Sequence, residues 1–183
     1  MGNFIVSTFI SLDGYVEAPD REMVLPKNSP DLHRYFIRPN IERGGVNIYG
    51  RVTYEGMAAY WTSPQAEPKE AAQLTATPKV VFSKTLKEAT WANTTIYRGE
   101  NLREEIAGLK RQTEKDLMIF GSATIGNAFM SAGLIDEFRI LINPIVLGAG
   151  RSLFESGHER FRLKLTGAQA FDSGSVLLSY ERE

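Results

Sequence analysis

Small, hydroxyl and basic residues follow three apolar segments of this sequence. The segments end at Tyr49, Phe82 and Phe120. The residues that follow them are Gly50, Arg51 and Thr53, then Ser83 and Lys84, then Gly121, Ser122, Ala123, Thr124 and Ile125. Glycine lets a phosphate approach the backbone, N–H groups at a helix start bind anions, and arginine or lysine adds positive charge. Two such junctions suit the pyrophosphate and ribose of a dinucleotide, whereas one junction alone is more often only a turn.

Asp31 is the second candidate for chemistry. It follows Pro30 at the start of a segment that carries Leu32, Tyr35 and Phe36 on one helical face. A carboxylate at this place can hold a heterocyclic ring and assist its protonation. An acidic residue in the first turn of a helix also stabilises the helix dipole. The sequence leaves both roles open.

The composition excludes several other kinds of site. The chain has no cysteine, which removes disulfides, thiolate metal ligands and cysteine nucleophiles. The two histidines, His33 and His158, lie far apart in the sequence, so we expect no metal site. The 21 basic and 22 acidic residues give a formal charge of -1, which does not favour nucleic acid as a partner.

The N-terminus and the hydropathy give expectations about location. The first seven residues lack the basic stretch and the long apolar core of a signal peptide. No apolar run approaches the length of a membrane span. We therefore expect a cytoplasmic protein without a membrane partner.

The elements that must position these residues alternate between strands and helices. Segments rich in β-branched and aromatic residues predict strands at residues 3–12, 45–49, 79–83, 94–97, 116–120 and 137–146. Apolar residues at helical spacing predict helices from Pro30 to about Pro39, over residues 51–61, after Asn101, and from Ser122 as N-cap to Ala132, with Gly133 as its stop. Residues 17–30 contain three prolines and are predicted to form a loop. Residues 161–170 and 175–182 predict an antiparallel hairpin.

This order predicts one α/β domain over residues 1–183. We expect three α/β/α layers around a mixed, mostly parallel central sheet that ends in a C-terminal antiparallel hairpin. In open parallel sheets, ligands bind at the carboxyl ends of the strands. The three groups of small and basic residues would meet at that edge.

Five ordered motifs resemble the dihydrofolate reductase superfamily. Residues 49–55 are similar to the Gly-Arg-x-Thr-x-Glu element of dihydrofolate reductases. The other four motifs, at residues 11–15, 120–125, 133–137 and 144–150, resemble the riboflavin-biosynthesis reductase domain of the same superfamily. The resemblance runs from about residue 4 to the final hairpin and so covers nearly the whole chain.

The resemblance implies a dihydrofolate reductase-like fold with NADPH lying across the strand ends. On the matching positions, the pyrophosphate and 2′-phosphate contacts would fall on Gly50, Arg51, Thr53, Ser83 and Lys84. The nicotinamide and the rest of the pyrophosphate would be lined by Gly121, Ser122, Ala123, Thr124 and Ile125. Asp31 stands at about the place of the helix carboxylate of folate enzymes. Two positions depart from the folate pattern: Gly121-Ser122 replaces a Gly-Gly pair, and Thr124 stands where many folate enzymes have arginine.

These observations predict an NADPH-dependent oxidoreductase that transfers hydride to a small heterocycle, either pterin- or folate-like or ribosylaminopyrimidine-like. The alternative is a non-catalytic nucleotide-binding sensor or interaction module that keeps the cofactor groove. The resemblance also implies a homodimer that pairs through its C-terminal strands, over residues 161–182.

Overall fold

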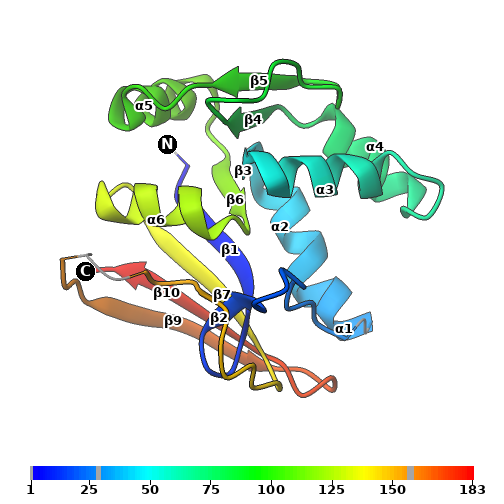
Figure 1. The fold of residues 1–183 in the computed structure, drawn as a ribbon, viewed down its shortest axis with the longest axis vertical. Coiled ribbons are helices and arrows are strands. Elements are labelled where there is room, and N and C mark those ends of the chain that lie inside the picture. Colours follow the sequence, from blue (N-terminus) through cyan, green and yellow to red (C-terminus); the bar gives the residue numbers. More distant parts are fainter. Residues whose placement is uncertain (1, 28–29, 156–158) are drawn as a thin grey trace.

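The computed structural model describes residues 2–27, 30–155 and 159–183, and Figure 1 shows their arrangement. Eight strands form one sheet in the order β5-β4-β3-β6-β1-β7-β10-β9. The bounds of these strands are β1 Phe4–Ser11, β3 Gly44–Gly50, β4 Lys79–Phe82, β5 Thr94–Tyr97, β6 Asp116–Phe120, β7 Glu137–Asn143, β9 Leu163–Ala170 and β10 Val176–Arg182. Strands β5, β4, β3, β6, β1 and β7 are parallel, β10 is antiparallel to β7, and β9 is antiparallel to β10. The predicted mixed, mostly parallel sheet with a terminal hairpin is confirmed.

Helices cover both faces of this sheet, so the three-layer prediction is also confirmed (Figure 1). The helical segments are α1 Pro30–Leu32, η1 His33–Ile37, α2 Arg38–Arg43, α3 Arg51–Trp61, α4 Pro68–Ala76, α5 Leu102–Gln112 and α6 Ala123–Ser131. On one face, Ile106 of α5 and Phe129 of α6 pack against Val6 and Ile48 of the sheet. On the other face lie the remaining helices, whose buried residues include Ile41, Tyr54 and Leu74.

The helix that begins at Pro30 continues past Pro39, where we predicted its end, to Arg43. The segment from His33 to Ile37 is a π-helix, and the N–H of Arg38 donates to the carbonyl of His33, five residues earlier. Pro39 then stands in the first turn of α2, where a proline's missing N–H costs no hydrogen bond. The widened turn therefore lets the chain pass the proline without ending the helix.

Three other differences separate the predicted and the observed elements. Strand β7 ends at Asn143 rather than at residue 146, directly before Pro144, which has no N–H for a strand ladder. Helix α4 has no predicted counterpart. The expected loop at residues 17–30 contains a bridge between Glu17 and Met23, and its residues 28–29 lie outside the described part of the chain.

The expected loop is also tied down by a second, small sheet. Strand β2 (Tyr15–Glu17) pairs antiparallel with β8 (Arg151–Ser152). This pairing joins the segment after β1 to the segment after β7, and both segments follow the carboxyl ends of their strands.

Within the described ranges, no helix has both the length and the apolar character that crossing a bilayer requires.

Candidate functional site

The first two groups of predicted residues that the fold brings together are those after β3 and β6. These strands are parallel neighbours in the sheet, so their carboxyl ends lie at the same edge. Helix α3 begins directly after Gly50, and α6 begins after Ser122. A Cβ on Gly50 would stand 2.3 Å from the Ser122 Oγ and 3.6 Å from the Ile125 Cγ2. The Ser122 side chain therefore lies against Gly50, which brings the starts of the two helices into contact.

Two consecutive residues with positive φ precede α6. Gly121 has a φ of +62° and Ser122 a φ of 58°. Glycine adopts this region freely, but serine pays a steric cost there that must be compensated by its surroundings. The N–H of Gly121 donates to the Ser7 carbonyl at 3.2 Å, and Thr53 of α3 lies beside Gly121. The sheet and α3 thus hold this turn in a shape that presents its backbone outward.

Neither helix start is closed by a side chain. Ser122 is the N-cap residue of α6, as predicted, but its backbone is left-handed and its side chain makes no cap bond. Gly50, the N-cap residue of α3, has no side chain to offer. Neither helix carries an acidic residue in its first turn. The partial positive charge of two adjacent helix starts is therefore available to an anion from outside.

Arg51 adds a cation at the first position of α3. Its Nη1 lies 3.1 Å from both Oε1 and Oε2 of Glu55, one turn further along the helix. The two side chains are 46% and 48% exposed, so this pair is open to water and to competing anions. Glu55 offsets the unfavourable placement of a cation at a helix start.

The third predicted group forms a hydroxyl-stabilised turn after β4, the strand beside β3. The Ser83 Oγ accepts hydrogen bonds from the N–H groups of Leu86 at 2.9 Å and Thr85 at 3.2 Å. Lys84, at the tip of this turn, is exposed. Arg98, which follows the neighbouring strand β5, donates from Nη1 to the carbonyls of Ser83 at 2.7 Å and Leu86 at 2.9 Å. Two cations therefore stand at the carboxyl ends of β4 and β5.

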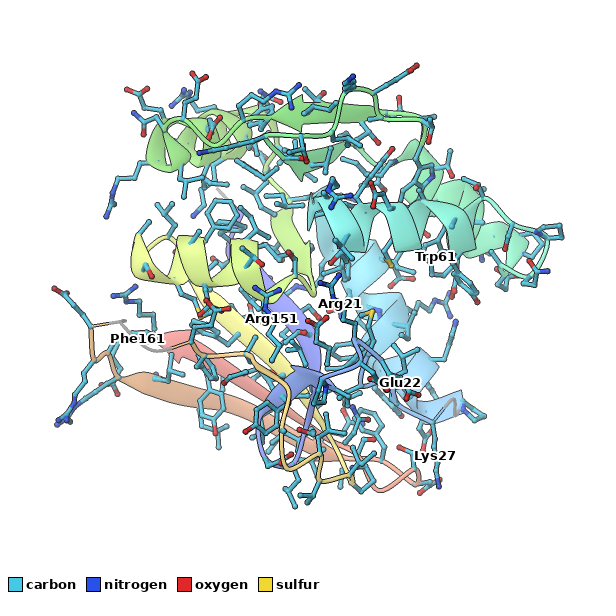
Figure 2. All side chains as sticks on the ribbon, viewed as in Figure 1. Arg21, Glu22, Lys27, Trp61, Arg151 and Phe161 are labelled. Carbon is cyan, nitrogen blue, oxygen red and sulfur yellow. The ribbon has the colours of Figure 1, made fainter. Side chains whose placement is uncertain are left out.

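A fourth cation reaches α6 from the small sheet. The Arg151 Nη2 donates to the Thr124 Oγ1 at 2.5 Å, and Thr124 is the second residue of α6. Figure 2 shows the Arg151 side chain between α6 and the β2 segment. Thr124 lacks a charge of its own, and the contact places a guanidinium at this helix start.

Asp31 lies in the first turn of α1 and is partly exposed. Its carboxylate makes no hydrogen bond or ion pair with residues 2–27, 30–155 or 159–183. Its neighbour Leu32 is buried against Leu141 and Leu177, which anchors this turn to the sheet. The geometry is compatible with both roles of Asp31, and both stay predictions.

Asp13 has a structural role in the loop after β1. Its carboxylate accepts hydrogen bonds from the N–H groups of Gly148 at 2.7 Å and Leu147 at 3.1 Å. A hydrogen bond from Ser11, with help from these two amides, holds the pKa of Asp13 below its ordinary value. Asp13 thus joins the loops that follow β1 and β7.

The amino ends of the strands carry a different set of charges. Arg43 donates to Asp116 at 2.8 Å and to Glu137 at 2.8 and 3.1 Å, and Glu137 first among these partners raises the Arg43 pKa. Asp136 accepts from Lys110 at 2.6 Å and from the N–H of Phe4 at 2.7 Å. These groups are partners of one another, so ion pairs hold this edge of the sheet.

Arg98 and Arg151 are not among the residues predicted to contact the cofactor. Arg98 directly follows a predicted strand, and its neighbourhood to Ser83 could have been found by pairing that strand with the one before it. The position of Arg151 depends on the pairing of β2 with β8, which has no clear sequence signal in segments of three and two residues. His158 lies outside the described residues. No group of three or more His, Asp or Glu residues that could hold a metal occurs among the described ones.

The sequence of this chain matches a known protein family. The family model of the RibD C-terminal domain matches residues 3–177. The protein YyaP of Bacillus subtilis is 31% identical over 179 residues, which are 96% of this chain and 93% of that protein.

Two solved structures share the fold. A proposed riboflavin biosynthesis protein of Shewanella sp. PV-4 superposes with a TM-score of 0.79 at 24% identity, over 99% of both chains. The dihydrofolate reductase of Enterococcus faecalis, in a complex with NADP(H), superposes with a TM-score of 0.65 at 15% identity, over 100% of this chain and 97% of that one. The fold is thus dihydrofolate reductase-like, and with the family model matching nearly every residue, the chain belongs to the RibD C-terminal domain family of reductase-like proteins.

Proposed function

We propose that this protein is an NADPH-dependent reductase that transfers hydride to a small heterocycle of the pterin or ribosylaminopyrimidine kind. One observation carries the proposal: two helices start in contact at the carboxyl ends of adjacent parallel strands, and neither is capped by a side chain. The N–H groups of both starts are then free for a phosphate chain. The E. faecalis dihydrofolate reductase of the same fold is complexed with NADP(H).

The residues at this edge fit the parts of a phosphorylated dinucleotide. Gly50 and Gly121 precede the starts of α3 and α6, whose backbone N–H groups would bind the pyrophosphate. Arg51, Lys84 and the Ser83 turn, with Arg98 behind it, supply cations and a hydroxyl for the 2′-phosphate. Ser122, Ala123, Thr124 and Ile125 line the start of α6.

When bound, the reduced nicotinamide supplies the hydride. The chain contributes orientation: the contact between Gly50 and Ser122 fixes the two helix starts, so the cofactor meets a preformed surface. Asp31 is our candidate for holding the heterocycle and guiding its protonation. The proposal covers both ring classes, pterins and ribosylaminopyrimidines, as substrates.

The test is a calorimetric titration of the protein with NADPH, followed by turnover assays with a panel of pterins and aminopyrimidines that measure loss of the reduced-nicotinamide absorbance. Arg51→Glu places a negative charge at the α3 start and should weaken NADPH binding by about tenfold or more, the size of a lost charge-assisted contact. Lys115→Glu is the control, because Lys115 is exposed and adjoins Asp116 at the amino end of β6. No heat on mixing NADPH with the wild-type protein would overturn the proposal.

The alternative function, a non-catalytic nucleotide sensor, makes a different prediction for the same assays. Such a protein would bind NADPH through the same residues but would oxidise it with none of the rings. Turnover with any of the rings separates the two functions. In a reductase, Asp31→Asn should lower turnover and leave NADPH binding unchanged.

We also propose that the chain pairs with a second copy through β9 and β10. Strand β9 is at the edge of the main sheet, and Leu165 on it is 53% exposed. Its cross-strand partner Tyr180 and the pair Ala168 and Leu178 extend this apolar surface, since cross-strand partners share a face. Sedimentation equilibrium should show a dimer at micromolar concentration and a monomer for Leu165→Glu. A wild-type monomer would contradict this.

A further inference from the structure

Arg151 lies beside the start of α6, where the proposed function places part of the dinucleotide. It lies on β8, outside the three strand-end groups, yet its guanidinium contacts the first turn of α6. The side chain is 39% exposed, so it is reachable by a ligand. We infer that Arg151 binds the pyrophosphate of the dinucleotide, and that two carboxylates hold it in place until the cofactor arrives. This inference rests on the proposed function.

The backbone on either side fixes where the guanidinium stands. Gly150 has a φ of +146°, and a Cβ there would lie 2.2 Å from the Glu17 carbonyl oxygen, so β8 sits close against β2. On the other side, the Asn127 side chain of α6 donates to the Leu153 carbonyl at 2.9 Å and accepts from the N–H of Glu155 at 3.1 Å. Arg151 is therefore delivered to α6 by a segment that is bonded to both β2 and α6.

The partners of the guanidinium leave room for an anion. Its Nη2 donates to the Thr124 Oγ1 at 2.5 Å and to the Glu155 Oε1 at 3.2 Å, and its Nη1 lies 4.0 Å from the Glu17 Oε1. The side chains of Glu17 and Glu155 are 29% and 45% exposed, and ion pairs of such exposed groups are weak in water. A pyrophosphate on the α6 amides offers stronger, two-pronged acceptors within reach of the same guanidinium.

Two neighbouring carboxylates stabilise the Arg151 guanidinium at the start of α6. The dipole of α6 is positive at this end and disfavours Arg151 there. Glu155 and Glu17 offset that cost, because α6 itself has no acidic residue in its first turn. A bound anion would pair with the Arg151 guanidinium in place of Glu155 and Glu17. Glu155 therefore competes with the cofactor for Arg151.

The decisive measurement compares NADPH with NADH in calorimetric titrations. Both cofactors contain the pyrophosphate, whereas only NADPH has the 2′-phosphate. Arg151→Gln should therefore weaken both affinities by the same factor, about tenfold or more, as expected for loss of a charge-assisted contact. Arg103→Gln is the matched control: Arg103 is an exposed arginine that donates to the Ala132 carbonyl at the other end of α6, and its loss should change neither affinity.

A second variant keeps the test independent of folding defects. Glu155→Gln frees Arg151 from its competitor and should tighten both cofactors about twofold to fivefold, the size of an exposed ion pair. Unchanged affinities in Arg151→Gln, or a loss confined to NADPH, would overturn the inference while the proposed function stands. A lower melting temperature of Arg151→Gln without a change in affinity would likewise make Arg151 a purely structural tie. Wild-type protein that binds neither cofactor would overturn the proposed function itself.

Discussion

The helices at the centre of the sheet and those at its periphery begin in different ways. At the periphery, Glu67 caps α4 by accepting from the N–H groups of Lys69 and Glu70, and Asn101 caps α5 by accepting from the N–H of Glu104. At the centre, α3 and α6 start without such bonds. A capping side chain accepts hydrogen bonds from N–H groups of the first helical turn, whereas at an uncapped start these groups can bind a ligand. Side-chain caps therefore stabilise the starts of α4 and α5, whereas the uncapped starts of α3 and α6 are the ones that we propose bind the cofactor.

The largest expected effect breaks the central pair of helix starts. Gly50→Ala puts a Cβ 2.3 Å from the Ser122 Oγ and 3.2 Å from the Ser122 Cβ, so the Ser122 hydroxyl must rotate away and the two helix starts must shift by a few tenths of an ångström. We expect the free energy of unfolding to fall by about 2–3 kcal/mol, as in overpacked cores, and NADPH affinity to fall by more than about tenfold. Denaturant unfolding and calorimetry measure the two effects.

The control for Gly50→Ala lies in the same helix. Gly56 is in the middle of α3, and a Cβ there would meet nothing within 4 Å. Gly56→Ala should stabilise the protein by about 0.5–1 kcal/mol, because alanine is the better helix former, and should leave NADPH binding unchanged. Equal losses of affinity in both variants would mean that the contact between the helix starts has no special role.

The next effect concerns the periphery alone. The Lys79 Nζ donates to the carbonyls of Leu74, Thr75 and Thr77 at 2.7–3.0 Å and so closes the end of α4. It also lies 4.6 Å from the centre of a Trp91 ring. Lys79→Met leaves these carbonyls unsatisfied and should lower the free energy of unfolding by about 2 kcal/mol. NADPH affinity should stay unchanged; a parallel loss of binding would contradict the division between periphery and centre.

The same lysine predicts a dependence of stability on pH. Burial lowers the pKa of Lys79 from 10.5 to about 8. Between these two values the unfolded chain holds the proton and the folded chain releases it, so the free energy of unfolding should rise with pH across this window. Lys79→Met should lack that rise. A wild-type stability that falls there relative to the variant would show that the three carbonyls outweigh burial.

How far the sequence predicts each region depends on how local its interactions are. The strand ends and the groups after Gly50 and Gly121 follow from short patterns of apolar and small residues, and the structure places them at one edge. The continuation past Pro39 depends on a π-turn that no composition reveals. The position of Arg151 depends on a strand of two residues that pairs only because β1 and β7 are neighbours. Ser122 suits a cap by residue type, but its backbone is left-handed and its side chain lies against Gly50, which is distant in sequence.

A smaller effect concerns Lys84, which we propose contacts the 2′-phosphate at the carboxyl ends of the strands. Lys84 is exposed at the tip of the turn after β4, beside the neighbouring Arg98, and is assigned here to the 2′-phosphate. Lys84→Gln should weaken NADPH by about fivefold to tenfold and leave NADH unchanged, because only NADPH carries that phosphate. The ratio of the two dissociation constants is the readout. Equal weakening of both cofactors would move Lys84 from the 2′-phosphate to the pyrophosphate.

The smallest effect tests the comparison of helix starts directly, with two substitutions of similar chemistry. Asn101→Ala removes the bond from Asn101 to the Glu104 N–H and should lower the free energy of unfolding by about 1 kcal/mol without changing NADPH affinity. Ser122→Ala removes a side chain that makes no cap bond and leaves a Cβ in the same left-handed backbone, so its stability should stay within about 0.5 kcal/mol of wild type. Equilibrium unfolding of the two variants side by side measures this. A cost of about 1 kcal/mol at Ser122 as well would mean that α6 is closed by its own serine after all, and that its amides are not reserved for an anion.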